Sequence, residues 1–172
     1  MNASLLPRRG LARNGAIALL LLFAAAAAVA ADLTQTYADK GTRIPDERHS
    51  SPQEASLRAL LQLELDPTAG RIRHLGTDRV QLIDTGSRLR IFHYDQAGEL
   101  QESHEYSGAG YQREQGTTFL RLRSASGRDD AVVLALTVAE EGLLQVDVYR
   151  VSPGVFGRSS ERVGRYLFHR GP

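Results

Sequence analysis

The chain has 172 residues, no cysteine and a formal net charge of +1 at pH 7. Without cysteine it can form no disulfide and carries no thiolate for a metal, so its fold must rest on its own hydrophobic core. Arginines alternate with Asp and Glu instead of forming a basic stripe, which argues against a nucleic-acid partner.

Residues 1–31 have the organisation of a secretory signal peptide. Arg8, Arg9 and Arg13 precede the apolar run AIALLLLFAAAAAVAA, and residues 28–30 place small side chains at the −3 and −1 positions of a cleavage site. The alternative is an uncleaved membrane anchor, but the run is short and its second half is alanine, which partitions weakly into lipid. We therefore expect cleavage and a periplasmic or secreted protein.

Residues 32–50 are polar and weakly patterned, and they are broken by Gly41 and Pro45. This composition predicts a flexible leader before the folded domain. We expect residues 51–172 to form that single domain, since their length suffices for one core.

The segment SPQEASLRALLQLEL, residues 51–65, predicts the one helix. Ser51 can cap it, Pro52 fits its first turn, and Glu54 completes a capping box. Four leucines recur at helical spacing and form an apolar stripe expected to face the core. They are Leu57, Leu60, Leu61 and Leu65.

After Gly70 the chain alternates between apolar and polar residues and is interrupted by short turns, which predicts about eight strands. The predicted strands are Arg79–Asp84, Arg88–Asp95, Glu99–Tyr106, Tyr111–Glu114, Thr117–Ser124, Ala131–Val138, Leu143–Val151 and Arg162–His169. Sequential short strands favour a mainly β (α+β) fold: an antiparallel meander curled into a barrel or half-barrel, a lipocalin-like roll, with the helix packed on it.

Two hairpins have a predicted register. With Gly142 in the left-handed position, the turn pairs three apolar positions on one face: Val138 with Leu144, Leu136 with Val146, and Leu134 with Val148. Ala131, Val133 and Ala135 make the opposite face apolar too, which predicts a central strand covered on both sides.

The second hairpin turns at Gly98. Its predicted register sets His93 opposite Gln101 and His104 opposite Arg90, so we expect the two imidazoles on opposite faces of the sheet. No histidine pair has helical ligand spacing, and we predict neither a metal site nor a cofactor.

The segment LIDTGS, Leu82 to Ser87, resembles the active-site loop of retropepsin-like aspartic proteases. The resemblance implies that Asp84 is catalytic, with Thr85 and Gly86 shaping the loop. Because only one such motif is present, the second carboxylate would come from a second chain. The same letters are ordinary turn residues between two alternating segments, and a β-hairpin explains them without catalysis.

A binding site for an apolar group is the broader interpretation. Aromatic residues that could line a concave face are Phe92, Tyr94, Tyr106, Tyr111 and Phe119, and Val155 and Phe156 form an apolar loop tip that could contact a partner or close the barrel. The alternative is that these side chains fill the core. We predict a non-catalytic binding protein for a small apolar ligand or an envelope protein, with the homodimeric aspartic protease as the second hypothesis.

Overall fold

A computed structural model describes residues 32–62, 76–123, 131–154 and 157–171 of the chain. Its strands are β1 (Gln35–Arg43), β2 (Gln53–Ser56), β3 (Arg79–Asp84), β4 (Arg88–Tyr94), β5 (Leu100–Ser107), β6 (Tyr111–Glu114), β7 (Thr117–Arg123), β8 (Ala131–Val138), β9 (Leu144–Gly154) and β10 (Gly157–Arg170). The helix α1 (Leu57–Gln62) and two 3-10 turns, η1 (Gly108–Gly110) and η2 (Glu140–Gly142), complete the described chain.

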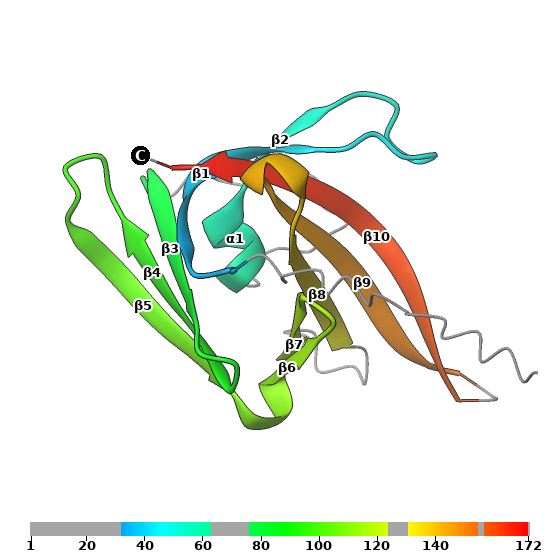
Figure 1. Ribbon diagram of the computed structural model, residues 1–172. Helices are drawn as coiled ribbons and strands as arrows, with labels where there is room; N and C mark the ends of the chain where they lie inside the picture. Colours follow the sequence, from blue (N-terminus) through cyan, green and yellow to red (C-terminus); the bar gives the residue numbers. More distant parts are fainter. Residues whose placement is uncertain (1–31, 63–75, 124–130, 155–156, 172) are drawn as a thin grey trace, which may run out of the picture.

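The ten strands form one antiparallel sheet in the order β5-β4-β3-β1-β10-β9-β8-β7-β6, with β2 paired to β1. The edge strands β5 and β6 are neighbours in the chain, joined only by η1. The sheet therefore curls until its two edges approach each other, and α1 lies inside the curl (Figure 1). The predicted mainly β half-barrel with one helix packed on it is confirmed.

The prediction of a flexible leader is wrong for residues 35–43. They form β1, which lies in the middle of the sheet between β3 and β10. The strand alternates correctly, but its four buried positions are Tyr37, Asp39, Gly41 and Arg43. Because only Tyr37 among them is a large hydrophobic residue, apolar periodicity cannot reveal this strand.

The predicted start of the helix is also wrong, because residues 53–56 form β2 and α1 begins at Leu57. Ser56 is the cap: its Oγ accepts a hydrogen bond from the Ala59 N–H at 3.2 Å. The buried Asp39 carboxylate of β1 accepts from the Ser56 hydroxyl at 2.9 Å and from the Arg58 N–H at 2.7 Å. A carboxylate from the neighbouring strand thus places the helix on the sheet.

The helix buries the leucine stripe as predicted, with Leu57, Leu60 and Leu61 in the core, whereas Leu65 lies outside the described residues. Around α1 the core consists mainly of aliphatic side chains, together with Tyr37, Tyr166 and Phe168. The β8–β9 register is also confirmed: Val138 faces Leu144, Leu136 faces Val146, and Leu134 faces Val148.

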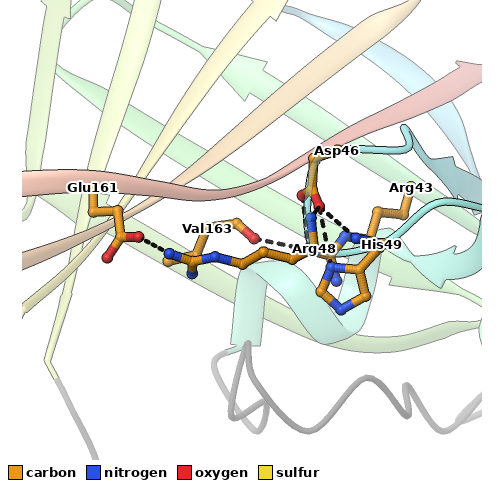
Figure 2. A network of polar contacts seen from close by, with 6 residues as sticks. All are labelled: Arg43, Asp46, Arg48, His49, Glu161 and Val163. Atoms are coloured by element: carbon orange, nitrogen blue, oxygen red, sulfur yellow. Dashed lines mark hydrogen bonds and ion pairs between the residues drawn. The ribbon is translucent and has the colours of Figure 1, made fainter.

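A polar network fastens the loop between β1 and β2 to β10 (Figure 2). The buried Arg43 side chain donates to the Asp46 carboxylate at 3.1 Å and to the Val163 carbonyl at 2.9 Å. On the surface, Arg48 forms an ion pair with Glu161. The loop is thereby held against β10.

Candidate functional site

The Asp-Thr-Gly-Ser segment forms the turn between β3 and β4. The Thr85 N–H donates to the Arg88 carbonyl at 3.0 Å, and Gly86 has a φ of 80° in the left-handed region. The hairpin interpretation of these residues is confirmed.

Asp84 ends β3 and connects the two ends of the sheet. Its carboxylate accepts hydrogen bonds from the Tyr111 hydroxyl at 2.6 Å, the Gly86 N–H at 2.8 Å and the Thr118 hydroxyl at 2.8 Å. Arg113 lies 3.7 Å away, and the Asp84 side chain is 0% exposed. Since Tyr111 and Arg113 belong to β6 and Thr118 to β7, this carboxylate joins strands far apart in the sheet order.

The same contacts fix the protonation states of this group. Burial would raise the pKa of the Asp84 carboxyl, but the hydrogen bonds from Tyr111, Gly86 and Thr118 and the charge of Arg113 hold it below its usual value. Burial and the bond to Asp84 raise the pKa of Tyr111 to about 12. At neutral pH the Asp84 carboxylate is therefore ionised and accepts, and the Tyr111 hydroxyl is protonated and donates. The bond between them can act as a structural clasp between β3 and β6.

A catalytic aspartate of the retropepsin type needs water and a second carboxylate beside it. Asp84 is enclosed by donors, and its side chain is 0% exposed in this single chain. Its geometry favours closure of the sheet over catalysis.

The predicted aromatic residues do not share one surface. Phe92 and Tyr94 alternate with the buried Ile91 and His93 and lie on the outer face of β4. On the inner face, Tyr106 donates its hydroxyl to the Leu61 carbonyl at 2.5 Å.

The remaining predicted binding residues do not lie together either. Tyr111 points inward to Asp84, while Phe119 lies on the outer face of β7. Val155 and Phe156 fall outside the described residues.

A groove with a volume of about 220 Å³ lies on the outer face of β7, β8 and β9. It is lined by Ala109, Gly110, Tyr111, Gln112, Phe119, Arg121, Val133 and Val151. Its apolar residues Phe119, Val133 and Val151 are half-buried, whereas Ala135 on the same face is buried, so the described residues meet the prediction that β8 is covered on both faces only in part. An apolar strip on an outer sheet face is a surface that a ligand or partner can cover.

One cation lines this groove. Arg121 is exposed and forms no ion pair or hydrogen bond with any residue in the described part of the chain. An unpaired guanidinium beside apolar side chains suits a ligand that has an apolar body and an anionic group.

A second hollow, with a volume of about 330 Å³, provides a comparison. It lies on the outer face of β4 and β5, and its lining includes Arg90 and Phe92. There the Arg90 Nε donates to the Glu105 carboxylate at 2.9 Å. The cation is already neutralised, so this hollow lacks the free charge that distinguishes the groove beside Arg121.

The predicted placement of His93 and His104 on opposite faces is wrong. A β-bulge between β4 and β5 shifts the register, so that Ile91 faces His104 and His93 faces Glu102. Gln101 is the extra residue, and a shift of one residue reverses every side chain that follows. The two rings now share the inner face, with centroids 5.7 Å apart.

His93 is 0% exposed, and neither of its ring nitrogens has a hydrogen-bond partner. Beside it, the His104 Nε2 lies 2.8 Å from the Glu102 carboxylate, which also accepts from Arg58 of α1 at 2.8 Å. In the described segments, no group of three or more His, Cys, Asp or Glu side chains has an arrangement that could hold a metal ion.

Comparison with protein-family models, with curated proteins and with solved structures finds no match to this chain. Among the helices of the described ranges, none has the length and apolar character that a membrane crossing requires.

Proposed function

We propose that this protein is a non-catalytic binding protein, exported to the periplasm or secreted, that holds the apolar part of an amphipathic carboxylate in the groove on β7, β8 and β9. The observation that carries the proposal is the half-exposed apolar floor of Phe119, Val133 and Val151 beside the unpaired Arg121. Apolar contact supplies the favourable free energy of binding, and the guanidinium selects an anionic head group.

The size of the groove limits the ligand. Sites for drug-sized molecules measure roughly 300–1,000 Å³, whereas this groove measures about 220 Å³ and is open on one side. It accommodates one aromatic ring or the end of a short acyl chain, with the remainder of the ligand in solvent. Octanoate is a suitable probe, and 1-octanol is its uncharged counterpart.

Binding is tested by NMR titration of the folded protein. We expect octanoate to shift the amide signals of β7 and β8 and to bind more tightly than 1-octanol. Arg121→Ala should weaken octanoate binding about tenfold, because it removes one charge-assisted hydrogen bond, and should leave 1-octanol binding unchanged. The matched control is Arg90→Ala, which removes an arginine already paired with Glu105.

Two results would contradict the proposed site. One is the absence of octanoate-induced shifts in β7 and β8. The other is an equal loss of octanoate affinity in Arg121→Ala and Arg90→Ala, which would indicate a general charge effect.

Export is tested separately. When the full chain is expressed in a bacterial host with a periplasm, we expect the protein in the periplasmic extract, with a mature terminus at Ala31 or Asp32. Leu20→Arg, which interrupts the apolar run, should retain the precursor in the cytoplasm. Recovery of the uncleaved chain in the membrane fraction would instead support the anchor interpretation.

A further inference from the structure

His93 is fully buried, and its imidazole makes no hydrogen bond that would stabilise the fold. An imidazole without hydrogen-bond partners destabilises a core relative to an apolar side chain of similar size. Both of its ring nitrogens are unpaired, and its cross-strand neighbour on β3 is Val80. Such an exception to the pairing of buried polar groups calls for a physical explanation.

The charged groups around His93 come from three elements. Arg58 extends from α1, and Glu102 and His104 lie on β5. From the third element, β1, Asp39 is the charged group on the same inner face, where the uncharged Tyr37 faces Val80. Asp39 is occupied with the cap of α1. Glu102 is occupied as well, since Arg58, Gln62 and His104 all contact its carboxylate.

An imidazolium at this position would therefore lie near the Arg58 guanidinium, and neither Glu102 nor Asp39, the carboxylates described on this inner face, is free to pair with it. Burial, followed by the charges of Arg58 and His104, lowers the pKa of His93 to about 4, against the opposing effect of Glu102. His93 is thus neutral in the folded protein at neutral pH.

Beside His93, polar bonds hold α1 to β5 and to Thr77, in addition to the Asp39 cap from β1. Arg58 pairs with Glu102 at 2.8 Å and donates to Thr77 at 2.9 Å. Beyond them, Gln62 also donates to Glu102, and Tyr106 donates to the Leu61 carbonyl. A positive charge on His93 repels Arg58 and competes with it for the Glu102 carboxylate. Both effects weaken the contact between α1 and β5.

We propose that protonation of His93 releases α1 from the inner face of β4 and β5, so that the concave side of the sheet opens on acidification. The direction of the pH dependence follows from the difference in proton binding between the open and the closed state. The unfolded or open chain binds a proton near the usual histidine value of about 6.5, whereas the closed protein binds it only near pH 4. The closed state is therefore fully favoured above pH 6.5 and loses about tenfold in its equilibrium constant for each pH unit between 6.5 and 4.

The pH range in which protonation of His93 acts lies above the range in which the carboxylate contacts are lost. The pKa values of Asp84 and Glu102 are held below their usual values, so the stability that they contribute is present above about pH 4 and is lost only at lower pH. Loss of α1 contacts between pH 6.5 and 4 is thus attributable to a histidine.

The test is amide hydrogen exchange of the full mature chain at pH 7, 6, 5 and 4.5, corrected for intrinsic exchange. We expect the protection of residues 57–62 to fall about tenfold per pH unit below 6.5, while the amides of β8 and β9 stay protected. His93→Leu should abolish this dependence, and His93→Gln, which is neutral at every pH, should abolish it too if the leucine variant does not fold. His169→Gln, at an exposed position of β10, is the control and should leave the dependence unchanged.

Each alternative result decides against the proposed release of α1. Protection of α1 that does not change with pH, or that falls equally in the His93 variants, excludes His93 as the sensor. A simultaneous loss of protection in β8 and β9 would show that acid unfolds the whole domain instead of releasing the helix.

Discussion

Asp84→Ala is expected to lower the free energy of unfolding by about 3–5 kcal/mol, because it leaves several donors without an acceptor. The Tyr111 hydroxyl, the Thr118 hydroxyl and the Gly86 N–H all donate to this one carboxylate. A hydrogen bond to a charged group contributes about 1.5–3 kcal/mol, and the three are not additive. The chain has no tryptophan, so urea unfolding should be followed by far-UV circular dichroism.

The control for this prediction is Thr85→Ala in the same turn. Thr85 is exposed and its hydroxyl makes only long contacts, at 3.3 Å to the Arg88 carbonyl and 3.4 Å to Ser87, so its loss should change stability by less than about 0.5 kcal/mol. If Asp84→Ala were as stable as this control, the clasp interpretation would fail. The aspartic-protease hypothesis would then deserve an assay of the same variant against unfolded substrate at acid pH.

Gly41→Ala is expected to destabilise the protein by about 3 kcal/mol or more, at the upper end of what overpacking costs. A Cβ atom on Gly41 would lie 2.4 Å from the Leu167 carbonyl oxygen and 2.3 Å from the Phe168 ring. Because β1 pairs with β10 here, the carbonyl can retreat only by breaking the ladder between the two central strands.

Thermal unfolding provides the measurement. Gly110→Ala is the matched control, since its added Cβ would meet nothing closer than the Arg121 carbonyl oxygen at 3.7 Å. We expect Gly41→Ala to melt well below both wild type and this control. Equal melting temperatures for the two variants would show that β1 and β10 can separate at this point without loss.

Most of the sheet could be predicted from the sequence because its strands alternate and its turns carry glycine. The boundaries of β3, β6 and β8 agree with the predicted boundaries at both ends, and the Gly142 hairpin has the predicted register. Strand β1 was missed because its inward positions include Asp39 and Arg43, whose burial depends on partners elsewhere in the chain. No local pattern reports such partners.

The candidate site was less predictable. The Asp-Thr-Gly turn is visible as a turn, but the bonds from Tyr111 and Thr118 come from strands that only the folded sheet brings near Asp84. The bulge at Gln101 carries neither glycine nor proline to mark it, and it alone decides that His93 and His104 share a face. The groove beside Arg121 combines residues of five elements, which the apolar alternation of β8 indicates only in part.

The pairing of β1 with β10 also determines the order in which the molecule can assemble. Tyr37 faces Arg170 and Arg43 faces Tyr166, so the centre of the sheet consists of contacts between residues most distant in the chain. Such contacts carry a high loop-closure entropy and make folding slow. The hairpins of β3–β5 and of β6–β9 can form locally, but the strand ladder that joins them through β1 is incomplete until β10 has been synthesised. The sheet of this domain can therefore be completed only after β10 has been synthesised, so folding ends later than the synthesis of the earlier strands.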